Sequence, residues 1–137
     1  MATQGNTFAS GSMNLSHAKR VWLEVLEVYN GGGIIDNASE FVTDGVGVVP
    51  AGTPVKLEDG KITAYTDAKI QACADAAAVV ALGINGYLQN DVHYRTSGEV
   101  GTGTVVYHGK MDANMIASAT LAKLKLNTTT PMVVFVG

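Results

Sequence analysis

The dipeptide formed by Asp59 and Gly60 is the feature that most restricts how this chain folds. It stands between residues 55–57 (VKL) and residues 62–65 (ITAY), two short runs rich in β-branched and aromatic residues. A type I′ hairpin turn needs positive φ at both central residues, and Asp-Gly adopts that conformation readily. The sequence therefore predicts a β-hairpin, with Glu58 and Lys61 facing each other beside the turn.

Short β-like runs recur along the rest of the chain. They cover residues 41–43, 46–49, 87–88, 92–96, 104–108 and 132–136. Asp44 and Gly45 mark a turn between the first two runs, and residues 118–124 fit one or two helical turns. With 16 glycines and 3 prolines in the chain, short strands and tight turns are favoured over long helices. The expected fold class is mainly β (β-rich α+β): a compact, sandwich-like or barrel-like domain with one or two short helices.

Residues 21–29 (VWLEVLEVY) fit two interpretations. As a helix, Val21, Trp22, Val25 and Tyr29 would share one face. As a strand, the two glutamates of this run would lie on opposite faces. The β-branched and aromatic content favours the strand.

Two other segments are defined by their composition. Residues 31–33 are all glycine, which ends the preceding element and is interpreted as a flexible hairpin loop. Residues 67–81 are rich in alanine, and their first part fits either a short helix or a loop. Residues 79–84 are expected to be buried.

The chain divides into a polar N-terminal arm, residues 1–20, and a β-rich domain, residues 21–137. The arm offers little to bury, and Phe8, Met13 and Leu15 are scattered through it. It is either a disordered tail or an arm that becomes ordered on a partner, with Phe8 as an anchor.

Composition limits the classes of function. The chain has 137 residues, a net charge of −3 and only 15% charged residues. A mildly acidic chain is not expected to bind nucleic acid or acidic membranes. A weakly charged surface on a small domain favours an oligomer or a docked subunit. No signal peptide and no membrane span are expected, because the longest apolar run is residues 76–82, so the protein is expected to be made in the cytoplasm.

Residues suited to catalysis or metal binding do not form a recognised pattern. His93 and His108, as neighbours in a β fold, could in principle hold a metal together with Asp91 or Asp112, but neither histidine has a second ligand at a fixed local spacing. The third histidine, His17, belongs to the arm.

Other catalytic signatures are missing as well. The single cysteine, Cys73, rules out an internal disulfide and is interpreted as a small buried side chain, because no feature nearby would activate its thiol. Nucleophile elbows and phosphate-binding loops are absent from the sequence. We therefore expect a binding or structural protein that is not an enzyme and needs no cofactor or metal.

Four stretches, taken in order, resemble one family. They are residues 49–55 (VPAGTPV), residues 81–84 (ALGI), residues 105–116 (VVYHGKMDANMI), and the closing pattern of residues 121–124 (LAKL) followed by residues 130–136 (TPMVVFV). This arrangement is similar to that of tailed-phage head decoration proteins of the lambda type and of related head-fibre proteins. The resemblance covers roughly residues 21–136. The alanine-rich stretch is longer than in the family, and the arm has no clear counterpart.

The resemblance implies a compact β-rich fold of the β-tulip type that self-associates as a homotrimer. It places the protein on the virion, on the exterior of an assembled capsid at threefold or quasi-threefold points, where it clamps the major capsid protein. In such proteins the N-terminal arm becomes ordered on the shell. The arm residues expected to contact the capsid are Thr3, Thr7, Phe8, Met13 and Leu15.

Two alternatives remain open at the level of the sequence. The chain could be the base of a head fibre, anchoring another fibre protein that binds the host. It could also be a small carbohydrate-binding module that recognises surface glycans, with stacking faces supplied by aromatic side chains. The candidates for stacking are Trp22, Tyr65, Tyr87, Tyr94 and Tyr107. We favour core or interface positions for these side chains, since aromatic residues are usually buried.

Overall fold

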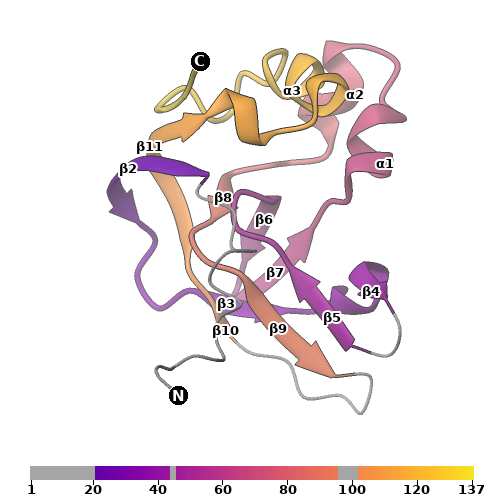
Figure 1. Ribbon diagram of the computed structural model, residues 1–137, viewed down its shortest axis with the longest axis vertical. Helices are drawn as coiled ribbons and strands as arrows, with labels where there is room; N and C mark the ends of the chain where they lie inside the picture. The colour runs from indigo at the N-terminus through magenta and orange to yellow at the C-terminus, as the bar shows by residue number, and fades with distance from the viewer. Residues whose placement is uncertain (1–20, 44–45, 96–101) are drawn as a thin grey trace, which may run out of the picture.

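The computed structural model describes residues 21–43, 46–95 and 102–137. They form a mostly β domain, in which a mixed sheet curls into a half-barrel and three short α-helices gather beside one end (Figure 1). The strands are β2 (Trp22–Val28), β3 (Gly33–Ile35), β4 (Val42–Thr43), β5 (Val46–Val49), β6 (Pro54–Glu58), β7 (Lys61–Ala64), β8 (Gly86–Leu88), β9 (Val92–Arg95), β10 (Thr102–Gly103), β11 (Val105–Asp112) and β12 (Val133–Val136). The helices are α1 (Asp67–Gln71), α2 (Ala76–Ala81) and α3 (Ser118–Leu124), with 3-10 turns η2 (Ala38–Phe41) and η3 (Ala113–Met115). The mainly β fold class is confirmed, with three α-helices where the sequence indicated one or two.

The strands form two sheets. The large sheet has the order β10-β3-β7-β6-β8-β11-β12, and β2 pairs with β11. Val106 pairs with both Tyr87 on β8 and Val28 on β2, so β2 lies on the opposite side of β11 from β8. The pairs β3–β7 and β11–β12 are parallel, and η3 and α3 supply the crossover from β11 to β12. The small sheet has the order β4-β5-β9.

The predicted hairpin is present as β6 and β7. Asp59 has φ 53° and Gly60 has φ 74°, the positive values that a type I′ turn requires. Glu58 pairs with Lys61 across the ladder, as expected. The ion pair at this place joins Lys56 to Glu58 along the strand instead, at 3.6 Å.

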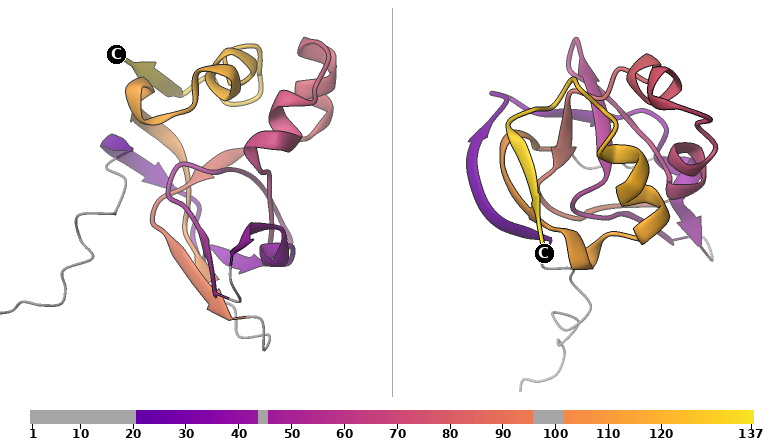
Figure 2. Two further views of the ribbon diagram at one scale, coloured as in Figure 1. Left: turned by 45° about the vertical axis from the view of Figure 1, so that its right-hand side comes forward. Right: turned by 90° about the horizontal axis from the view of Figure 1, so that it is seen from above.

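The buried side chains form two separate cores. The first fills the half-barrel and combines the large sheet with the small one, through residues such as Val49, Ile62 and Leu88. The second lies between the β11–β12 end of the sheet and the helices, with Ile70 of α1 and Leu124 of α3 among its members. Figure 2 shows the helices grouped beside the half-barrel rather than inside it.

Residues 21–29 form a strand, and its irregular pairing explains why the sequence was ambiguous. Leu23 and Leu26 are extra residues on β2 at two register shifts against β11. Each shift is a β-bulge, which changes the side of the sheet that the following residue faces. As a result every third residue of β2 is half-buried (Trp22, Val25 and Val28), and the residues between them are exposed. A period of three resembles the period of a helix more than that of a regular strand.

Two local expectations need correction, and the choice between helix and loop in the alanine-rich segment is decided in favour of helix. Residues 31–33 do not form a hairpin loop, because β2 pairs with β11 whereas β3 pairs with β7 and β10. The alanine-rich segment holds two helices, each begun by a side-chain cap: Thr66 accepts from the Lys69 amide and Asp75 from the Ala78 amide. Phe41 ends η2, so β4 starts one residue later than expected.

Candidate functional site

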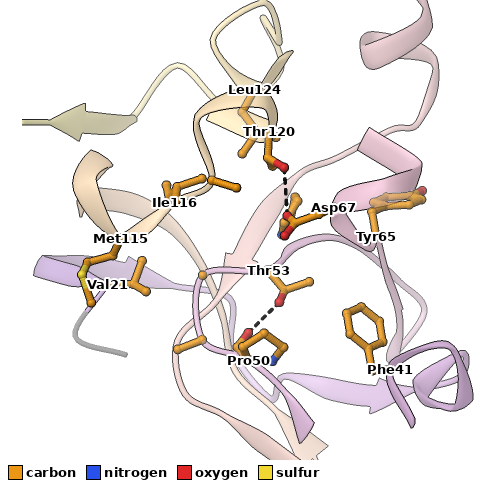
Figure 3. A pocket seen from close by; sticks show the side chains of 14 residues that line it. Val21, Phe41, Pro50, Thr53, Tyr65, Asp67, Met115, Ile116, Thr120 and Leu124 are labelled. Carbon is orange, nitrogen blue, oxygen red and sulfur yellow. Dashed lines mark hydrogen bonds between the residues drawn. The ribbon is translucent and has the colours of Figure 1, made fainter. Parts of the chain in front are cut away.

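A pocket lies where the half-barrel meets α1 and α3 (Figure 3). Its volume is about 190 Å³, and apolar side chains such as Val21, Phe41 and Met115 supply much of its lining. Pockets that hold a small-molecule ligand usually have ~300 Å³ or more. The pocket is therefore small for a ligand site.

The polar groups of this pocket are engaged within the chain. Thr120 is 1% exposed, and its hydroxyl donates to Asp67 Oδ1 at 2.9 Å and accepts from Gln71 Nε2 at 3.1 Å. Thr53 Oγ1 donates to the Pro50 carbonyl at 2.6 Å. These bonds tie α3 to α1 and close the loop before β6, so they have a structural explanation.

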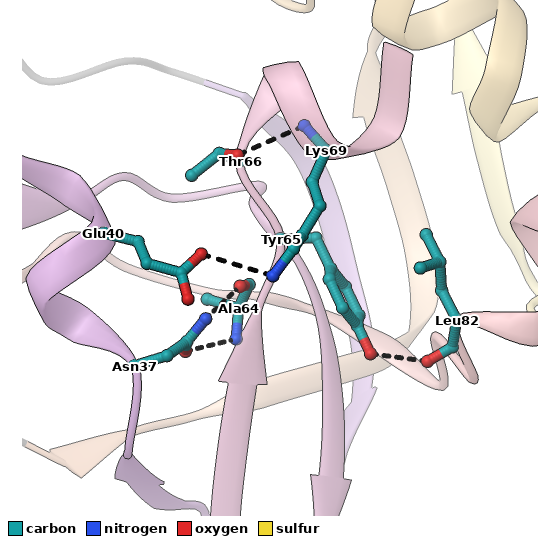
Figure 4. A network of polar contacts seen from close by, with 7 residues as sticks. All are labelled: Asn37, Glu40, Ala64, Tyr65, Thr66, Lys69 and Leu82. Atoms are coloured by element: carbon teal, nitrogen blue, oxygen red, sulfur yellow. Dashed lines mark hydrogen bonds and ion pairs between the residues drawn. The ribbon is translucent and has the colours of Figure 1, made fainter. Parts of the chain in front are cut away.

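A second group of polar contacts joins η2, β7 and the first two helices (Figure 4). Lys69 Nζ lies 3.5 Å from Glu40 Oε1, and both side chains are half-exposed. The Tyr65 hydroxyl donates to the Leu82 carbonyl, and burial raises the pKa of this phenol. An exposed ion pair and a buried phenol bonded to backbone hold elements together, and neither offers a reactive group.

Two asparagine side chains act as additional partners for the β6–β7 hairpin. Asn37 donates to the Ala64 carbonyl at 2.6 Å and accepts from the Ala64 amide at 2.9 Å (Figure 4). Asn85 makes the same two bonds to Leu57, both at 2.8 Å. A primary amide carries one acceptor and a pair of donors, so one side chain can satisfy both backbone groups of a strand residue.

The residues considered for a metal site are dispersed. His93 lies exposed on β9 of the small sheet, whereas His108 lies on β11 of the large sheet. His108 Nδ1 is 2.9 Å from Glu27 Oε1. Asp91 accepts from the Ala51 amide at 2.7 Å, and Asp112 from the Asn114 amide at 2.9 Å. Within residues 21–43, 46–95 and 102–137, no three side chains of the metal-binding types come together.

Cys73 is 8% exposed, which confirms its interpretation as a buried side chain. Its sulfur lies 3.7 Å from the Lys69 carbonyl oxygen. In the described part of the chain, none of the helices has the length and apolar content of a membrane-spanning segment.

The aromatic residues proposed for sugar stacking lie mostly in the two cores. Tyr65, Tyr87 and Tyr94 are at most 8% exposed, and burial raises the pKa of all three phenols. Trp22 is half-buried, and its indole N–H donates to the Leu88 carbonyl at 2.9 Å. The Tyr107 ring packs on another tyrosine, with ring centroids 4.6 Å apart. Stacking on a sugar needs an open aromatic face, which the three buried tyrosines do not provide.

The clearest candidate for function is the outer face and edges of three strands, β2, β11 and β12, which we call the ribbon. Residues that pair across a sheet share a face, and Lys110 on β11 pairs with both Glu24 on β2 and Val134 on β12. Lys110 Nζ lies 3.6 Å from Glu24 Oε1, with both side chains about half-exposed. The ribbon therefore has one face toward the second core and one face open.

Apolar side chains stand on both edges of the ribbon. Leu23 and Leu26 on β2 are 53% and 51% exposed, and Val134 and Val136 on β12 are 49% and 42% exposed. With Met132, which precedes β12, they make up five of the eight large apolar side chains exposed in the described residues. Single exposed apolar residues are ordinary, but a concentration on two strands indicates a contact surface.

Sequence reasoning did not identify this surface. The low charge content pointed to an interface, but it did not indicate where the interface lies. The available signal was the pair of leucines placed three residues apart in β2, each followed by a glutamate. In the sequence alone, this pattern bears on the choice between helix and strand and does not indicate a surface.

The arm residues expected to contact a capsid lie outside the described residues. They are Thr3, Thr7, Phe8, Met13 and Leu15. The same holds for His17 and for the turn expected at Asp44 and Gly45.

Comparisons with protein-family models, with curated proteins and with solved structures found no match to this chain.

Proposed function

We propose that this chain is a non-enzymatic virion protein that binds the outer surface of an assembled phage capsid and stabilises it as a homotrimer. The observation that carries the proposal is the concentration of exposed apolar side chains on β2 and β12, in a chain with few charges. A protein that works by contact needs such a surface, whereas an enzyme needs a cleft with reactive groups. The resemblance of residues 21–136 to head decoration proteins supplies the identity of the partner.

The stabilising effect follows from mass action. A protein that binds the assembled shell, and not the separate subunits, shifts the equilibrium toward the shell. Each trimer contacts several subunits at a threefold or quasi-threefold point, so weak contacts add up over the capsid. In this proposal the partners are the major capsid protein and two further copies of the chain.

The arm is assigned to the contact with the shell. Phe8, Met13 and Leu15 are large apolar residues in a polar leader, and Thr3 and Thr7 precede them. An extended segment that adds to an exposed sheet edge gains affinity through backbone hydrogen bonds, and pockets for alternate side chains provide specificity.

Other assignments receive less support. The base of a head fibre would use the same contact surface, and it differs only in carrying a further fibre protein. A carbohydrate-binding module is disfavoured, because Tyr65, Tyr87 and Tyr94 are buried.

The test is binding to shells assembled from a tailed-phage major capsid protein encoded in the same genome. Purified chain is mixed with shells and with unassembled capsid protein, and each mixture is sedimented. We expect binding to shells alone and an increase in the temperature at which the shells disrupt. A chain that binds neither, or that binds unassembled subunits equally well, would contradict the proposal.

The contribution of the arm has its own test. A variant that starts at Val21 is compared with the full chain on the same shells. We expect at least ~10-fold weaker binding, because the arm's backbone and apolar contacts are lost. Equal binding by the two chains would show that the arm has no part in the contact.

A further inference from the structure

We propose that copies of this chain associate head to tail, with the β2 edge of one copy against the β12 edge of the next. The inference rests on the self-association that the proposed function includes, and it assigns the surface responsible. Leu23 and Leu26 of one copy would pack against Val134 and Val136 of its neighbour.

The sheet topology leaves these two edges open within the described residues. β2 and β12 each pair with one strand, and for both strands that neighbour is β11. An edge strand presents unpaired backbone groups that can pair with a strand of another chain. The two strands flank β11, so a copy can use one edge for each of two neighbours.

The two edges differ in charge. On β2, leucines alternate with Glu24 and Glu27, and the strand contains no basic residue. β12 is wholly apolar and carries no charged side chain. Unlike edges can therefore meet without bringing the glutamates of two copies together, which favours their contact over that of two β2 edges.

A symmetric contact fits less well. Two β2 strands placed together would bring Glu24 and Glu27 of one copy near the same residues of the other, and like charges repel. A contact between two β12 strands would leave Leu23 and Leu26 uncovered. The head-to-tail contact covers both apolar edges with one repeated interface.

A repeated head-to-tail contact closes into a ring when the rotation between neighbours allows it. With three copies the ring is a trimer, in agreement with the assembly proposed for the capsid surface. Each copy then has both of its edges buried.

Single charge substitutions at each edge test the contact. Leu26→Glu alters the β2 edge, and Val134→Glu alters the β12 edge. Ile34→Glu is the matched control, because Ile34 is 53% exposed on β3, away from the ribbon. A charge placed in an apolar contact is desolvated without a partner, so each edge variant is expected to weaken association by at least ~100-fold. The molar mass of each variant is measured by light scattering over a range of concentrations, and circular dichroism establishes that each is folded.

We expect the wild type and Ile34→Glu to be trimers and both edge variants to be monomers. The inference is overturned by a wild-type chain that is monomeric at every concentration, by edge variants that remain trimeric, or by an Ile34→Glu variant that dissociates like the edge variants.

Mixing the two edge variants distinguishes head-to-tail from symmetric association. The Val134→Glu chain keeps an intact β2 edge and the Leu26→Glu chain keeps an intact β12 edge, so their mixture can form one complete interface. We expect heterodimers, and no larger species, in the mixture alone. If Val134→Glu self-associates by itself, the contact joins two β2 edges; if Leu26→Glu does so, it joins two β12 edges, and either result rejects the proposal.

Failure of this inference and failure of the proposed function are separable. The light-scattering experiments contain no capsid, whereas the sedimentation experiment measures binding to shells. A chain that trimerises through β2 and β12 but does not bind shells supports the inference and contradicts the proposed function. A chain that binds shells, and whose two edge variants both remain trimeric, supports the proposed function and contradicts the inference.

Discussion

The ribbon and the interior of the half-barrel contain the same types of apolar residue, but these residues are exposed in the ribbon and buried in the half-barrel. Leu88 on β8 is fully buried in the first core, whereas Leu26 on β2 is 51% exposed. Val55 on β6 is fully buried, whereas Val134 on β12 is 49% exposed. The apolar residues of the half-barrel stabilise the fold of one chain, and those on the ribbon edges are available to a second chain.

The boundary between the two regions runs along a single strand. Val105 and Val106, at the start of β11, are fully buried and pair with β8. Farther along β11, Lys110 is exposed and pairs with β2 and β12. The half-barrel and the ribbon are therefore continuous through the backbone of β11, and the burial of their side chains separates them.

Replacing one leucine in each region gives the largest expected contrast. Leu88→Ala removes a fully buried side chain and leaves a cavity, which is expected to lower the free energy of unfolding by ~2–5 kcal/mol. Leu26→Ala, the matched variant on the ribbon, is expected to change it by less than ~0.5 kcal/mol. Urea denaturation measures both values, at a protein concentration low enough for each variant to be monomeric. Equal losses would mean that the ribbon edge also supports the fold of the single chain.

Removing the Asn85 side chain is expected to have an intermediate effect on the free energy of unfolding. Asn85→Ala removes both hydrogen bonds to the backbone of Leu57. Because that amide and carbonyl are then left unpaired, the free energy of unfolding is expected to fall by ~1–3 kcal/mol. Asn90 is exposed in the turn between β8 and β9, so Asn90→Ala is the control, with an expected change below ~0.5 kcal/mol. The same denaturation experiment compares the two variants. A value for Asn85→Ala as small as that of Asn90→Ala would refute the role of this side chain as a strand partner.

The parts of the fold that depend on local sequence were predictable. The β6–β7 hairpin follows from the positive φ that Asp59 and Gly60 adopt, which depends on those two residues and not on distant contacts. The helix expected at residues 118–124 is α3, and the strand expected at residues 132–136 is β12 within one residue. Short apolar runs bounded by turns carry most of their structural preference within themselves.

The parts that depend on distant pairing were not predictable. The bulges at Leu23 and Leu26 exist because β2 is matched to β11, some eighty residues away. A triple glycine between two strands suggests a hairpin, but β3 pairs with β7 and β10, and nothing near residues 31–33 indicates that choice. The candidate surface depends on the same long-range pairing, because the sequence does not show that β2 and β12 flank one strand.

The ion pair between Glu24 and Lys110 is expected to have the smallest effect on the free energy of unfolding, and it separates effects on folding from effects on association. The two groups lie 3.6 Å apart on the open face of the ribbon, with side chains 48% and 55% exposed. Solvent screens such a pair, so a double-mutant cycle with Glu24→Gln and Lys110→Met is expected to give a coupling energy below ~0.5 kcal/mol for unfolding. The same cycle applied to the association constant, measured by light scattering at low and high salt, tests whether these charges act between copies. A larger coupling in association than in unfolding is the result expected if the face serves contact, because burial at an interface reduces screening. A coupling confined to unfolding would instead assign the pair to the stability of the single chain.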